Sequence, residues 1–172
     1  MQDIDFKTLS LKDALDLAIL IEEEAEERYR EFVHQMETHD TPGVARFFRF
    51  MAVNEAKLGQ ELSERRQKLF GDAPSEVERS MIFDVEAPEF YRTRAFMSVE
   101  EALDLAKDAE NKAYEFFDKA LPQIDDKDVR ELFVELREEE VEHIELVEKV
   151  RAKVEIEPDF DPDDFVDPPQ GQ

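Results

Sequence analysis

The stretch SLKDALDLAILIEEEA (residues 10–25) recurs later in the chain as SVEEALDLAKDAENKA (residues 98–113). Each copy begins with a Ser that has an acidic residue three positions later, which is typical of a helix N-terminus. Each then places apolar residues at spacings of three and four, which predicts an amphipathic helix. We therefore expect two related helices, each turning one apolar face toward a core.

A further helix is predicted after each of these two. Pro at a first helical position and Gly after a last one mark helix ends. The four predicted helices span Ser10 to Glu37, Thr41-Pro42 to Phe70, Ser98 to Leu121-Pro122, and Asp126 to Lys153. The second and fourth also align with each other, with Val44, Phe48, Met51 and Glu55 corresponding to Val129, Phe133, Leu136 and Glu140. The chain thus reads as two related helical hairpins.

The connection between the two hairpins, residues 71–97, is long. At up to about 3.3 Å per extended residue it can span one bundle length of roughly 40 Å. Short, long and short connections are typical of a bundle with one crossover. We predict an all-α, ferritin-like four-helix bundle over residues 1–156. Residues 157–172 are predicted to form an acidic, Pro-rich tail that is either disordered or pinned to the surface.

Composition excludes several classes of protein. The formal net charge is −24, from 46 acidic and 22 basic residues. Such a surface repels phosphate backbones and anionic lipids, so we expect neither nucleic acid nor a membrane as a partner. The absence of Cys excludes disulfides, iron–sulfur clusters and Cys-ligated zinc within these residues. Any transition metal has to be held by Glu, Asp and His.

The N-terminal residues lack the basic segment of a secretory signal, and no run of about 18 apolar residues is present. We therefore expect a cytoplasmic protein.

Each predicted apolar stripe is interrupted by one Glu near its middle. These residues are Glu22, Glu55, Glu110 and Glu140, and the fourth helix adds His143 one turn after Glu140. A buried carboxylate costs several kcal/mol unless something compensates it, and no Lys or Arg falls within the stripes. Two divalent cations would balance four carboxylates. Mixed carboxylate and imidazole ligation suits iron, manganese or zinc.

A second interpretation of the same pattern is chance. Among 46 acidic residues, some fall on any apolar stripe. Glu22 and Glu140 each belong to a run of three Glu, so a small rotation of either helix would turn a different side chain inward. Four Glu at matching places in two internal alignments favour the metal site.

These residues resemble the rubrerythrin branch of the ferritin-like superfamily, over roughly residues 10–153. The resemblance is carried by Glu22-Glu23-Glu24-Ala25 with Tyr29, by Glu110, Ala113 and Phe117, and by Glu140-Val141-Glu142-His143. It implies two irons between the four helices. Glu55 and Glu140 would bridge the ions, Glu22 and Glu110 would be terminal ligands, and His143 would bind one iron. Tyr29 would donate a hydrogen bond that orients a carboxylate, with an ordinary core tyrosine as the alternative.

The chain departs from the family pattern in three ways. Leu58 stands where the family has its other His, and Ala113 where rubrerythrins offer an extra Glu. The rubredoxin-type module of full rubrerythrins needs four Cys, so redox turnover here would require an external electron donor.

The expected function is that of a metal-binding protein, with two iron ions, or manganese or zinc instead. It would act in iron oxidation and handling or in peroxide reduction, and as an enzyme it would be a ferroxidase or a peroxidase. The alternative is a non-catalytic bundle with a single structural metal or a degenerate site. A homodimer is expected from the apolar crossover, which contains Phe83, Phe90, Tyr91 and Phe96, and from Phe47, Phe48 and Phe50, expected to supply core and a dimer face.

Overall fold

The computed structural model describes residues 4–82 and 85–156. The predicted acidic tail and Phe83 lie outside the described residues. Within them, all regular structure is helical. The elements are α1 (Leu11–Thr38), α2 (Pro42–Phe70), α3 (Arg79–Ile82), the 3-10 turn η1 (Phe90–Arg92), α4 (Val99–Ala120), the 3-10 turn η2 (Leu121–Gln123) and α5 (Lys127–Ile156).

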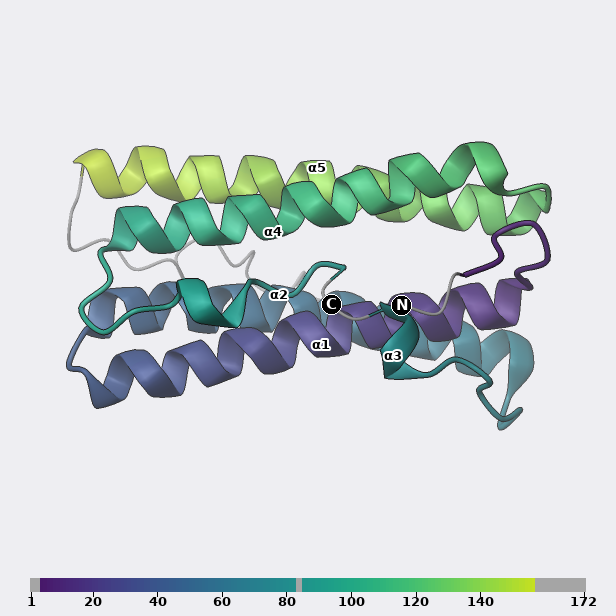
Figure 1. Cartoon of the computed structure of the whole chain (residues 1–172), viewed down its shortest axis with the longest axis horizontal. Helices are drawn as coiled ribbons and strands as arrows, with labels where there is room; N and C mark the ends of the chain where they lie inside the picture. Colours follow the sequence, from purple (N-terminus) through teal and green to yellow (C-terminus); the bar gives the residue numbers. More distant parts are fainter. Residues whose placement is uncertain (1–3, 83–84, 157–172) are drawn as a thin grey trace, which may run out of the picture.

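The four long helices form two hairpins that lie side by side in an elongated bundle (Figure 1). Helix α1 packs against α2, and α4 packs against α5. Helices α2 and α4 run in the same direction, so the connection between them returns along the length of the bundle (Figure 1). The predicted ferritin-like four-helix bundle with one long crossover is confirmed.

The helix ends follow the capping signals in the sequence. The Ser10 side chain accepts a hydrogen bond from the Asp13 backbone N–H, and Ser98 and Glu101 form a complete capping box. Gly71 follows α2 with a φ of 57°, a conformation that favours glycine. The two short elements of the crossover, α3 and η1, were not predicted, because three or four residues are too few to show a period.

The core consists of two apolar clusters with a carboxylate level between them. On α1, residues 14–21 belong to one cluster and residues 29–36 to the other, and Glu22 falls between them. On each of the other three long helices a Glu again separates the two clusters: Glu55, Glu110 and Glu140. Two dry clusters therefore hold the helices at a fixed spacing on both sides of the four carboxylates.

The crossover is partly buried and partly exposed. Ile82, Ala87 and Met97 are buried, whereas the aromatic side chains of Phe90, Tyr91 and Phe96 are 60%, 78% and 75% exposed. The expectation that Phe47, Phe48 and Phe50 supply core is confirmed, because all three are fully buried, and the same burial prevents them from forming a dimer face. They fill one of the two apolar clusters instead.

The internal repeat extends to a cross-helix ion pair in each hairpin. Arg66 of α2 donates to Asp16 of α1, with a distance of 2.7 Å from Nε to Oδ1. In the other hairpin Arg151 of α5 donates to Asp104 of α4, with a distance of 2.8 Å from Nη2 to Oδ1. Asp16 is only 7% exposed, and Arg66 also donates to the backbone carbonyls of Gly71 and Ala73, which start the crossover.

The Asp16 carboxylate is expected to stabilise the fold at neutral pH. Burial by itself raises its pKa, but hydrogen bonds from Arg66 and Lys12 outweigh burial, so the pKa lies below the ordinary value of 3.8. The native state therefore releases this proton more readily than the unfolded chain, and the stabilisation disappears as pH falls through the lowered pKa. Asp16→Asn should lower the unfolding temperature by several degrees at pH 7 and by progressively less below pH 3.8. Asp125→Asn, at an exposed position, is the matched control; equal shifts in both variants would contradict the prediction.

No helix in residues 4–82 or 85–156 is both long enough and apolar enough to cross a membrane.

Candidate metal centre

The four predicted glutamates meet at the carboxylate level of the bundle. Glu22, Glu55, Glu110 and Glu140 come from α1, α2, α4 and α5, and each is at most 1% exposed. His143 lies three residues after Glu140 on the same face of α5, and its side chain is 12% exposed. The structure thus brings together all five side chains that the sequence singled out.

Gly59 allows α2 to approach α1 closely at this level. A Cβ atom at Gly59 would lie 3.3 Å from the Glu22 Cβ, which is tighter than ordinary van der Waals contact. The neighbouring Leu58 is half-buried and packs against the apolar cluster at one end of the bundle. Helix α2 therefore contributes Glu55 to the centre, and Leu58 offers it no donor atom.

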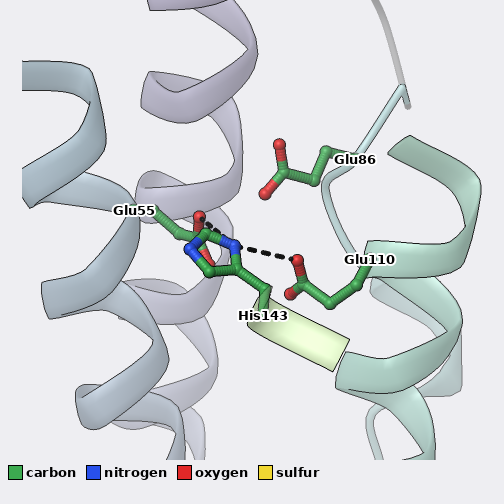
Figure 2. Close-up of side chains that lie close together, drawn as sticks. All are labelled: Glu55, Glu86, Glu110 and His143. Carbon is green, nitrogen blue, oxygen red and sulfur yellow. Dashed lines mark hydrogen bonds and ion pairs between the residues drawn. The ribbon is translucent and has the colours of Figure 1, made fainter. Parts of the chain in front are cut away.

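A sixth side chain, Glu86, joins the centre from the crossover rather than from a helix. Figure 2 shows its carboxylate directed toward Glu55, Glu110 and His143. Glu86 is 1% exposed. Sequence reasoning missed it because an irregular segment has no periodicity from which an inward position can be read. The one available signal was an acidic residue flanked by Val85 and Ala87 in an apolar stretch.

The potential ligand atoms fall into two groups that share Glu86. One group consists of Glu55, Glu86, Glu110 and His143, and the other of Glu22, Glu86 and Glu140. Within each group the ligand atoms lie within 4.8 Å of one another. Metal–oxygen bonds of about 2.0–2.2 Å place ligands on opposite sides of an ion about 4.0–4.4 Å apart. Each group is therefore close to the size that one ion requires.

Two hydrogen-bonding side chains converge on Glu110. The Tyr29 hydroxyl donates to Oε1 of Glu110 at 3.3 Å, and Nδ1 of His143 lies 3.2 Å from Oε2. The same Nδ1 is 3.9 Å from Oε2 of Glu55. Tyr29 is fully buried, and burial together with the charges of Glu110 and Glu55 raises the pKa of its phenol well above 10. Tyr29 is therefore a neutral hydrogen-bond donor to Glu110.

The other carboxylates have no such donors. Both oxygens of Glu22, Glu55, Glu86 and Glu140 lack a hydrogen-bond partner among the described residues. Burial, reinforced by the charge of neighbouring carboxylates, raises the pKa of each of these four glutamates above its usual range. For Glu86 the pKa reaches about 8. Unpartnered carboxylates at this depth are costly unless a cation compensates them.

Among the residues that the structure describes, His143 is the one nitrogen donor of the centre. Burial by itself lowers its pKa, but the hydrogen bond and the charge of Glu110, aided by Glu86, raise the pKa to about 9. The cluster therefore attracts positive charge strongly enough to hold a proton on a largely buried imidazole. Carboxylate oxygens with one imidazole nitrogen form a donor set that iron, manganese and zinc accept, so the residues present fit a metal centre.

Loss of the Tyr29 hydroxyl is expected to weaken metal binding. In Tyr29→Phe, Glu110 loses the donor at Oε1, and partners of this kind typically contribute about 10–100-fold to metal affinity. Competition with a chromogenic chelator measures the change. Tyr114→Phe, on α4 but outside the centre, is the control; an unchanged affinity in Tyr29→Phe would reduce Tyr29 to an ordinary core tyrosine.

The chain is similar to known proteins in both sequence and fold. No curated protein matches the chain. Its structure is similar to the crystal structure of an uncharacterized conserved protein from Magnetospirillum magnetotacticum MS-1. The TM-score is 0.66 at 28% sequence identity, over 84% of this chain and 95% of that one. The family model for rubrerythrin matches residues 13–151. This range contains all six side chains of the metal centre: Glu22, Glu55, Glu86, Glu110, Glu140 and His143. With its crossover bundle and its buried carboxylate level, this chain belongs to the rubrerythrin family.

Proposed function

We propose that this protein binds two iron ions between its four long helices and acts in iron oxidation and handling or in peroxide reduction. One observation carries the proposal. Four helices each place one Glu at the same buried level, and three of these four carboxylates have no hydrogen-bond partner among the described residues. Two divalent ions would compensate this charge, and family membership supports iron as the metal.

The proposed ligands divide between two ion positions. Glu55, Glu110 and His143 would hold one ion, and Glu22 and Glu140 the other. The charge of Glu22 acts on Glu55, and the charge of Glu110 acts on Glu140. The charge of Glu110 also acts on Glu22, so the two groups interact throughout, and the proposed bridging roles of Glu55 and Glu140 rest on the resemblance to the family.

A bound pair of iron ions would supply the two electrons that reduce hydrogen peroxide to water or dioxygen to peroxide. The chain's own residues would set the environment for this reaction. The two apolar clusters exclude bulk water from both ends of the centre. Tyr29 would hold Glu110 in one orientation, and His143 is the most exposed of the proposed ligands.

A second candidate is a bundle with a single structural metal and no catalysis. This candidate is favoured by a difference between the two groups of ligand atoms. One group contains the imidazole nitrogen of His143, whereas the other consists of carboxylates alone. An ion at Glu55, Glu110 and His143 would then stabilise the fold by binding to the native state.

The proposal includes two partners, an external electron donor and a second copy of this chain. The 172 residues contain no Cys, so repeated redox turnover would draw electrons from a donor outside them. We also propose a homodimer, for which the exposed aromatic residues of the crossover, Phe90, Tyr91 and Phe96, offer an apolar surface.

Anaerobic titration of the metal-free protein with Fe(II) tests the function, followed by exposure to dioxygen or hydrogen peroxide while near-ultraviolet absorbance is recorded. We expect two Fe(II) per chain and oxidation faster than in buffer. One bound ion without accelerated oxidation would favour the structural-metal candidate. No binding would overturn both.

A further inference from the structure

We infer that Glu86 is a metal ligand carried by the crossover, that it is shared by the two ion positions, and that metal binding fastens residues 85–89 to the bundle. This inference rests on the proposed function, since it requires a metal at the centre. It adds to the four long helices a ligand from the connection between the hairpins.

The first argument is the state of the Glu86 side chain. It is 1% exposed, and neither carboxylate oxygen has a hydrogen-bond partner among the described residues. A surface loop normally keeps its carboxylates in water, because a buried and unpartnered one is costly. Figure 2 shows this carboxylate pointing into the centre, toward Glu55 and Glu110. Its position calls for a cationic partner at that point.

The second argument is the membership of the two ligand groups. Glu86 is the one residue that belongs to both. Without it, the group of Glu22 and Glu140 would keep only two side chains, and neither contains nitrogen. Leu58 supplies no replacement, because its side chain packs against an apolar cluster. Glu86 therefore completes the poorer position and also contributes an oxygen to the position that holds His143.

The third argument is how the backbone beside Glu86 is held. Nζ of Lys112, from α4, donates to the carbonyl of Ala87 at 3.0 Å. Nη1 of Arg28, from α1, donates to the carbonyl of Pro88 at 2.6 Å, and its guanidinium lies 5.8 Å from the ring centre of Phe90. Side chains from both hairpins thus donate hydrogen bonds to the backbone directly after Glu86. These two contacts hold the backbone beside Glu86, and the charge of Lys112 only partly offsets that of the carboxylate, because the pKa of Glu86 remains raised to about 8.

These contacts link metal occupancy to the position of the crossover. When Glu86 coordinates an ion, residues 85–89 gain an attachment at the bundle centre in addition to those from Arg28 and Lys112. Local opening of the crossover then requires release of the metal bond, so it should become rarer when the metal is bound.

The test compares full-length wild-type protein with Glu86→Gln, an isosteric change that removes the charge. Fe(II) is titrated anaerobically against a competing chelator to give stoichiometry and affinity. We expect two ions in the wild type, and at least one of them bound about 100-fold more weakly in the variant, the upper end of what even indirect ligand partners contribute. Glu86→Asp retains the charge on a shorter side chain and should fall between the two.

Limited trypsin digestion gives a second readout that does not depend on activity. Cleavage after Arg79, Arg92 and Arg94 reports opening of the crossover on both sides of Glu86. Fe(II) should slow this cleavage in the wild type and leave it unchanged in Glu86→Gln.

Glu89→Gln is the matched control, since it removes the same charge from the same segment outside both ligand groups. Equal weakening in Glu89→Gln would show a general charge effect and overturn the inference. The inference would also be overturned if Glu86→Gln bound Fe(II) as tightly as the wild type and Fe(II) protected it equally from trypsin. That outcome would leave the di-iron proposal intact. A wild type that binds no Fe(II) would refute the proposed function, and the inference with it.

Discussion

Loading the centre with Fe(II) under anaerobic conditions should raise the thermal unfolding midpoint by about 10 °C relative to chelator-treated protein. An ion present at about 1,000 times its dissociation constant stabilises the native state by about 4 kcal/mol. For a chain of this size each kcal/mol corresponds to roughly 2–4 °C. The effect is expected to be this large because the ions would bind where the carboxylates of Glu22, Glu55 and Glu140 have no hydrogen-bond partner in the described part of the chain. Scanning calorimetry with and without Fe(II) measures it.

The control for this experiment is the surface charge. A chain with a net charge of −24 attracts cations everywhere, so a shift alone does not locate the ions. The doubly substituted Glu55→Gln/Glu140→Gln removes two carboxylates of the centre and leaves the exposed ones in place. A shift as large in this variant as in the wild type would assign the effect to the surface and contradict a buried metal centre.

Glu140→Gln should change stability in opposite directions in the two forms of the protein. Without metal it should raise the free energy of unfolding by about 2 kcal/mol, because the neutral amide removes the cost of burying a charge and ends the repulsion from Glu86 and Glu110. With Fe(II) the variant should unfold below the wild type, since a proposed bridging ligand is lost. Urea denaturation of both forms measures the pair of effects.

Glu140 is a better choice for this test than Glu110, although both are buried. Glu110 accepts a hydrogen bond from Tyr29 and lies against His143, so its removal would leave the Tyr29 hydroxyl without its acceptor and His143 without its nearest carboxylate. Glu138→Gln, exposed on the same helix, is the control and should be near neutral in both forms. A metal-free Glu140→Gln that is less stable than the wild type would mean that the carboxylate already has a favourable environment.

Local sequence was sufficient to predict the long helices. The caps at Ser10 and Ser98 and the turn at Gly71 depend on contacts within a few residues, so their residue types predict them directly. The inward glutamates were predictable for a similar reason, because a helix turns residues three and four apart to one side. Helical periodicity also predicted that the Phe residues of α2 supply core, whereas their additional role in a dimer face is not compatible with their complete burial.

Partner choice in the ion pairs required the tertiary structure. Asp16 and Asp104 stand in the same five-residue motif, and each pairs with an Arg of the following helix. Yet Asp16 is nearly buried, whereas the Asp104 side chain is 60% exposed. Arg66 also donates to the backbone carbonyls of Gly71 and Ala73, so the start of the crossover adds contacts to the ion pair of the first hairpin.

The sequence by itself therefore determined the all-helical bundle, the crossover topology and five of the six side chains at its centre, because these follow from helical periodicity and local capping. Only the tertiary structure placed Glu86 beside them. Its position depends on Arg28 and Lys112, which bind the neighbouring backbone from 60 and 25 residues away along the chain. An irregular segment takes its path from such distant contacts, and no local pattern of residues encodes them.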